Sequence, residues 1–231
     1  MTGFLVTIIV GVTIACVVVV TLVALLRFQK ERQERQRQEL EQLSRRCYRI
    51  VDLLNCLTDR YLPLMAKQIL VEYLISSVGL LGRYKLARDL EDMLPGYIRL
   101  LDELKNGQQA SLNDKVQTHV QLSQVQQGLQ SVPLLLRGLV SNGFVDKATA
   151  KDQVTLVRFS FSLAHHDLLV KEALASLELD KKASALEKLR HALAEMEKVA
   201  SFNESEAVIN KLNNTIQRVE NELFGKSSRA G

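Results

Sequence analysis

The feature that most constrains this chain is an uncharged apolar segment at its start. Residues 4–26 (23 residues) contain no Asp, Glu, Lys or Arg and are rich in Val, Ile and Leu. A helix of that length rises about 34 Å at ~1.5 Å per residue, enough to cross a hydrocarbon core of ~30 Å. We therefore expect a short exterior stub and a transmembrane anchor within residues 1–27. The anchor residues are Phe4, Leu5, Ile8, Ile9, Val17, Leu22, Leu25 and Leu26.

This segment differs from a cleaved signal peptide. No charged side chain precedes it, and its apolar core is longer than the core of a signal peptide. A lipoprotein cleavage box ending at Cys16 is disfavoured, because Thr13 stands three residues earlier and the apolar run continues beyond the cysteine. We interpret the segment as an uncleaved anchor.

Basic residues that follow the segment predict its orientation. Residues 27–49 hold eight basic and four acidic side chains, so the whole net charge of +4 lies there. The positive-inside rule then places the N-terminus outside and the C-terminal domain in the cytoplasm. Such a local excess favours contact with anionic lipid headgroups over nucleic-acid binding. The juxtamembrane basic residues are Arg27, Lys30, Arg32, Arg35 and Arg37.

Residues 28–62 are expected to form a solvated helix that gains an apolar seam in its second half. The seam has the 3,4 spacing of a heptad repeat, and it is typical either of a helix entering a bundle, which we favour, or of a parallel dimer. It comprises Leu40, Leu43, Cys47, Ile50, Leu54, Leu57 and Tyr61. Cys47 and Cys56 lie too far apart on one helix for a disulfide, about 13 Å.

Residues 63–143 are expected to form an apolar-centred helical region. Residues 64–81 follow Pro63 and carry one narrow polar stripe, which is typical of a helix in the centre of a core. A second membrane span is the rival interpretation, but Lys67 and Glu72 would be costly in a bilayer. Whether this helix touches the bilayer is left open.

Turn signals divide the rest of this region. A helix over 84–104, with a possible break at Pro95-Gly96, is expected to end at Asn106-Gly107. A capping start at Ser111 and Asp114 predicts a polar, surface-lying helix to residue 130. Pro133 predicts a separate short helix over 134–140, ended by Asn142-Gly143.

Residues 144–231 are expected to form three helices and a short polar tail. Neither Gly nor Pro occurs from 144 to 224, and three apolar seams repeat at 3,4 spacing. The predicted connections lie at Leu179-Asp180 and at residues 201–203, where Asn203 and Glu206 suit a capping box. No strand pattern is found. The predicted fold is all-α: an N-terminal transmembrane helix followed by a helical bundle or stacked helical hairpins, without a β-sheet.

No residue pattern indicates a catalytic, metal or cofactor site. His165-His166-Asp167 is the one cluster with chemical character, but adjacent helical histidines point about 100° apart and cannot chelate one ion together. Glycine-rich nucleotide motifs are absent. We expect no cofactor, no small-molecule substrate and no enzymatic activity.

Two functions from different classes remain. The first is a membrane-anchored cytoplasmic scaffold or adaptor that binds a protein partner near the membrane. The alternative is a structural subunit of a membrane or envelope assembly, which self-associates through the heptad seam of residues 40–61. An enzyme is the least expected of the three classes.

Overall fold

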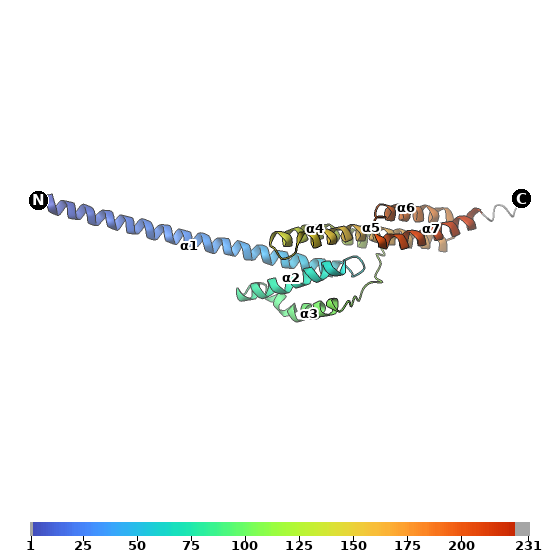
Figure 1. Ribbon diagram of the computed structural model, residues 1–231, viewed down its shortest axis with the longest axis horizontal. Helices are drawn as coiled ribbons and strands as arrows, with labels where there is room; N and C mark the ends of the chain where they lie inside the picture. Colours follow the sequence, from blue (N-terminus) through green and yellow to red (C-terminus); the bar gives the residue numbers. More distant parts are fainter. Residues whose placement is uncertain (1, 225–231) are drawn as a thin grey trace.

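The computed structural model describes residues 2–224, with side chains for 27–202 and 205–224. This part of the chain is an all-α helical bundle of seven helices without a strand (Figure 1). The predicted fold class is confirmed to that extent. The side chains of the eight predicted anchor residues lie outside the described set. The helices are α1 Thr2–Cys56, α2 Leu64–Arg83, α3 Arg88–Lys105, α4 His119–Ser141, α5 Lys147–Glu178, α6 Lys182–Glu197 and α7 Asn203–Phe224.

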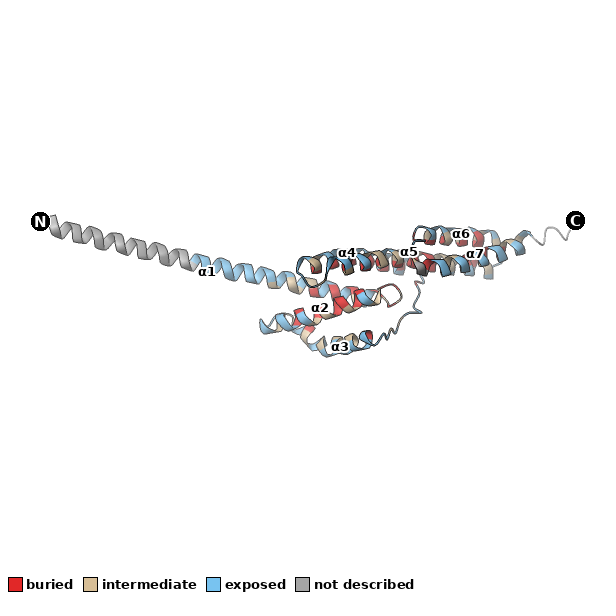
Figure 2. Ribbon diagram, in the orientation of Figure 1, coloured by how far each residue is buried: buried red, intermediate tan, exposed pale blue. Residues whose placement is uncertain are grey.

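Helix α1 is one continuous helix of 55 residues that extends far beyond the bundle (Figure 1). Its residues 27–39 are all exposed, as expected for a run of Gln, Glu and Arg with no apolar face (Figure 2). The helix ends at Cys56, whereas the sequence suggested that it would run on to Pro63. Leu57 and Tyr61 therefore lie in the connection to α2, where both are still buried.

A first core joins α1, α2, α4 and α5 as far as Leu168, and it includes Leu90 of α3. Helix α2 lies inside this core, with Leu70, Leu74, Val78 and Leu81 at 0% exposure. Among the described residues, α2 is also the one helix long and apolar enough to cross a membrane. More than half of its most apolar stretch is buried against the rest of the chain, which is typical of a core helix.

Helix α3 covers the outer side of α2 and begins later than expected. Residues 84–87 form a turn, in which Lys85 and Ala87 have φ values of 56° and 59°, so the helix starts at Arg88. The suggested break at Pro95 is absent, because α3 continues through the proline from Arg88 to Lys105. The predicted end at Asn106-Gly107 is confirmed, with Gly107 at φ 74°.

Helix α4 departs most from the predicted boundaries. It begins at His119, where the Thr118 hydroxyl accepts a hydrogen bond from the Gln121 amide, so the capping start at Ser111 and Asp114 is wrong. It continues through Pro133 to Ser141, so the separate helix over 134–140 is wrong too. The cause is tertiary packing: the buried stripe runs from Leu122 past the proline to Leu139 and outweighs the one lost donor.

A second core joins the C-terminal half of α5 to α6 and α7. The predicted connection at Leu179-Asp180 is confirmed, and Asp180 adopts the left-handed conformation that ends α5. The connection predicted at 201–203 lies at 198–202, because α6 already ends at Glu197 and α7 begins at Asn203. The proposed cap by Asn203 lies outside the described side chains. Because α5 is unbroken, it contributes to both cores. The residues of the second core are Ala173, Leu186, Leu189, Ala192, Met196, Val199, Leu212, Ile216 and Val219.

Candidate functional site

A groove runs between α1 and α4, and we refer to it as the α1–α4 groove. Its volume is about 620 Å³. On each helix the first and last lining residues are 14 residues apart in the sequence, which corresponds to about 21 Å along the helix axis. The groove is therefore elongated. It is lined by Gln42, Arg45, Arg46, Arg49, Asp52, Leu53 and Cys56 of α1 and by Gln124, Gln127, Gly128, Ser131, Leu134, Leu135 and Gly138 of α4.

Small residues of α4 allow the two helices to lie close together. A Cβ at Gly128 would lie 3.1 Å from the Leu57 side chain, and one at Gly138 would lie 4.0 Å from the guanidinium carbon of Arg46. Residue numbers thus rise along α4 as they fall along α1, so the helices are antiparallel. The tight approach at Gly128 lies near the end of the groove at Gln124 and Cys56.

Positive charge dominates the α1 side of the groove. Three arginines line it against the single carboxylate of Asp52. Arg46 donates a hydrogen bond to the Tyr73 hydroxyl at 3.0 Å, which holds its side chain against α2. Arg45 and Arg49 are exposed, and Arg45 lies 3.9 Å from Glu41, a loose contact. Both guanidinium groups are therefore available to a bound molecule.

Apolar side chains complete the groove. Leu53 and Leu135 are buried at its base, while Leu134 is 66% exposed on the α4 side. A leucine that exposed, beside arginines, offers both apolar area and charge-assisted hydrogen bonds to one occupant.

The two described cysteines differ in environment. Cys47 is fully buried, and burial raises the pKa of its thiol to about 11. Cys56 is exposed at the groove, where its thiol contacts the Gln124 carbonyl oxygen at 3.4 Å, and partial burial raises its pKa. Both thiols are thus protonated near neutral pH.

The heptad seam faces the rest of the same chain. Cys47, Ile50, Leu57 and Tyr61 are at most 3% exposed and belong to the first core. Leu40, Leu43 and Leu54 are partly buried against it. The juxtamembrane basic residues of 27–37, by contrast, all lie on the exposed part of α1.

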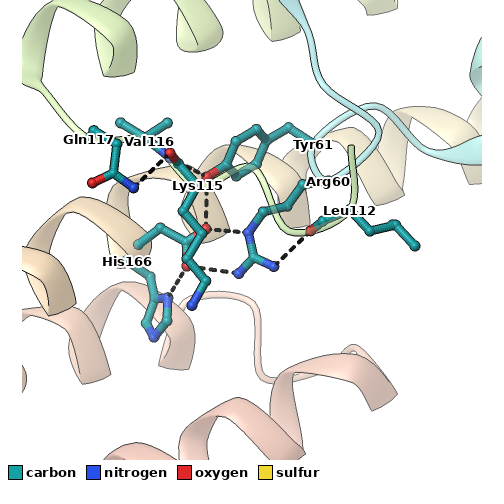
Figure 3. A network of polar contacts seen from close by, with 8 residues as sticks. Arg60, Tyr61, Leu112, Lys115, Val116, Gln117 and His166 are labelled. Carbon is teal, nitrogen blue, oxygen red and sulfur yellow. Dashed lines mark hydrogen bonds and ion pairs between the residues drawn. The ribbon is translucent and has the colours of Figure 1, made fainter. Parts of the chain in front are cut away.

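Asp167 of α5 is the centre of a buried polar cluster that joins three segments. Figure 3 labels Arg60, Tyr61, Val116 and His166 of this cluster. Arg60 donates to both carboxylate oxygens of Asp167, at 2.5 Å from Nε and 2.8 Å from Nη2. Tyr61 donates its hydroxyl to Asp167 at 2.7 Å and accepts from the Val116 amide at 2.9 Å. The α1–α2 connection, the α3–α4 connection and α5 are therefore tied together at one carboxylate.

The electrostatics of this cluster suit a structural role. Burial by itself would raise the pKa of Asp167, but contacts from His166, Arg60 and Tyr61 outweigh it and hold the pKa at about 2. Both carboxylate oxygens are occupied. A carboxylate that stays charged and saturated near pH 7 has no proton or free lone pair to offer a substrate.

A second buried ion pair supports the same connections. Lys67 of α2 pairs with Asp59, which also accepts from the amides of Ala110 and Ser111. The Asp59 amide in turn donates to the Ser111 hydroxyl at 2.8 Å. Ser111 thus anchors the α3–α4 connection to the α1–α2 connection and does not start a helix.

The two adjacent histidines differ in burial: one side chain is packed in the interior and the other is partly exposed. His166 is 9% exposed, and its Nδ1 lies 3.4 Å from Asp167, an ion-pair distance if the ring is protonated. His165 is more exposed and lies 3.5 Å from Glu195. Among the described side chains, no group of three or more His, Cys, Asp or Glu residues could hold a metal ion.

The sequence reasoning missed both the groove and the Asp167 cluster. Asp167 was considered with the histidines, while its main partners, Arg60 and Tyr61, stand more than 100 residues earlier. One local signal was available for the groove: small residues recur on one face of α4 at Gly128, Ser131 and Gly138, and such residues often permit close helix approach.

Comparison with protein-family models, with curated proteins and with solved structures finds no match to this chain.

Proposed function

We propose that this protein is a membrane-anchored helical adaptor that binds a protein partner in the α1–α4 groove. The observation that carries the proposal is the groove itself, which is elongated, basic and open along two helices. The anchor rests on the uncharged run of residues 4–26 and on the basic residues that follow it. The same charge bias supports a cytoplasmic domain.

Because α1 is one continuous helix, its length sets the distance between the groove and the proposed membrane span. If the membrane span ends at Leu26, Arg45 lies 19 residues further along one helix, or about 28 Å. A tilt of about 40° would still leave roughly 21 Å, well beyond the Debye length of about 8 Å at physiological salt. The groove would then stand clear of the headgroups, while residues 27–37 stay near them.

Self-association through the heptad seam is the weaker alternative. Cys47, Ile50 and Tyr61 are already packed inside the first core. A second chain could reach them only if that core opened, which would expose buried leucines at a large cost. The burial of the seam therefore favours the adaptor over the self-assembling subunit.

Site-specific photo-crosslinking tests the adaptor proposal. A photo-reactive amino acid is placed at Gln127, which is exposed in the groove, or at Gln217, which is exposed on α7. We expect irradiation of native membranes to give a discrete protein adduct from position 127 and none from 217. Equal adducts from both positions, or none from 127, would contradict the proposal.

A further inference from the structure

We infer that the occupant of the α1–α4 groove is an acidic amphipathic helix of a partner protein. The inference rests on the proposed function and adds the chemical class of the partner. It follows from the length of the groove, from its pattern of charge and apolar surface, and from its height above the proposed membrane.

The shape of the groove favours a helix over a small anion. Its lining extends about 21 Å along each helix, which equals about four helical turns. A phosphate or a single headgroup would contact one or two of the arginines and leave the rest of the groove empty. A third helix laid between α1 and α4 would contact both walls along their length, as in other helix-in-groove complexes.

The chemistry of the walls defines the face that such a helix must present. The exposed guanidinium groups of Arg45 and Arg49 lie one helical turn apart and match carboxylates spaced three or four residues apart. Leu134, at 66% exposure on the opposite wall, offers apolar area to the same occupant. The partner helix therefore carries Glu or Asp along one edge and Leu-like residues beside it.

Position argues against anionic lipid as the occupant. The net charge of the groove lining is +2, from three Arg and one Asp. If the span ends at Leu26, even a tilted α1 holds this charge more than one Debye length of about 8 Å beyond the headgroup layer. An acidic protein segment in the cytoplasm can reach it, whereas a headgroup in the bilayer cannot.

Fluorescence anisotropy with a defined probe tests the inference. The full chain is placed in nanodiscs of neutral phosphatidylcholine. The probe is a fluorescein-labelled, hydrocarbon-stapled 18-residue helix with Leu on one face and Glu along its edge. Its counterpart has Lys in place of every Glu. We expect the acidic helix to bind at least about tenfold more tightly than the basic one. Its affinity should fall several-fold when salt rises from about 50 to about 200 mM.

Charge reversal provides the decisive comparison. The double substitution Arg45→Glu and Arg49→Glu should lower the affinity for the acidic helix by about tenfold or more. It should also make the basic helix the more tightly bound probe. This gain of binding cannot come from unfolding. The control is Lys147→Glu with Lys151→Glu, an exposed pair at the same spacing on α5, which should change either affinity by less than about twofold.

Three outcomes would overturn the inference. One is no binding of the acidic helix, and another is equal binding of the acidic and basic helices. The third is binding of phosphoinositide vesicles or inorganic phosphate through Arg45 and Arg49 without binding of the helix. If position 127 still crosslinks to a protein in any of these cases, the adaptor proposal stands and the acidic partner alone is rejected. If position 127 gives no adduct, the adaptor proposal fails as well.

Discussion

At the scale of single residues, Asp167 ties together segments that lie far apart in the sequence. Its carboxylate receives Arg60 and Tyr61 from a connection more than 100 residues earlier in the chain. Only 3% of Asp167 is exposed, so the loss of its charge would leave Arg60 without its main partner in a partly buried site. Such clusters stabilise one arrangement of segments because breaking them is costly.

Replacement of this carboxylate should destabilise the bundle. We expect Asp167→Asn to lower the free energy of unfolding by about 3 kcal/mol, measured by urea unfolding of the full chain in a mild detergent. The control is Glu220→Gln, which removes a more exposed pair with Arg190 at 2.7 Å and should cost less than about 1 kcal/mol. Similar losses in the two variants would show that the Asp167 cluster adds little.

The same carboxylate predicts a loss of stability in acid. Its pKa falls from 3.8 to about 2 on folding, so its contribution is complete above about pH 4 and disappears as the pH falls towards 2. The loss amounts to about 2 kcal/mol. Asp59, whose pKa is also lowered, acts in the same direction. Unfolding free energies measured from pH 5 to 2 should fall less steeply in Asp167→Asn, and parallel profiles would contradict this assignment.

At the scale of the elements, two glycines of α4 face the same groove with different amounts of space. A Cβ at Gly128 would lie 3.1 Å from Leu57, whereas one at Gly138 would have 4.0 Å to Arg46. We expect Gly138→Ala to stabilise the chain by up to about 1 kcal/mol through helix propensity. Gly128→Val should destabilise it by about 1 to 3 kcal/mol, because α4 must move away from α1. Thermal unfolding of both variants checks the contrast, which fails if the two substitutions shift stability equally.

The second core depends on the seam of α6. Leu189 is 1% exposed between α5, α6 and α7, so Leu189→Ala should cost about 2 to 5 kcal/mol. Leu174 on α5 is 48% exposed, and the same substitution there should cost less than about 1 kcal/mol. Urea unfolding of the two variants compares their free energies of unfolding. A small effect at Leu189 would mean that the core of α5, α6 and α7 is loosely packed.

Helices with strong apolar periodicity, and those that end at a glycine, Asn or Asp, could be predicted from the sequence. The connections after α3, α4 and α5 lie at their expected residues, because each needs a left-handed residue at the helix end. The errors occurred where packing overrides a local signal, as at Pro133. The groove could not be predicted, since it depends on which face of α4 meets α1, and the two segments stand about 80 residues apart.

At the scale of the whole molecule, the long helix α1 leads to a bundle at its far end (Figure 1). Residues 27–39 of α1 are exposed throughout, so this part of the chain acts as a spacer between the proposed anchor and the first core. A bundle held at that distance would reach cytoplasmic partners without lying on the bilayer. This arrangement depends on the proposed orientation of the chain.

The exposed thiol of Cys56 allows that orientation to be measured directly. Cys47 is fully buried, so Cys56 is the reactive cysteine in a Cys16→Ser variant of the full chain. A membrane-impermeant maleimide is added to intact cells at about pH 8, which favours the thiolate. We predict no labelling of Cys56 until the membrane is permeabilised, whereas a cysteine introduced by Thr2→Cys in a Cys56→Ser background is labelled from outside. Labelling of Cys56 in intact cells would contradict a membrane-anchored adaptor with a cytoplasmic groove.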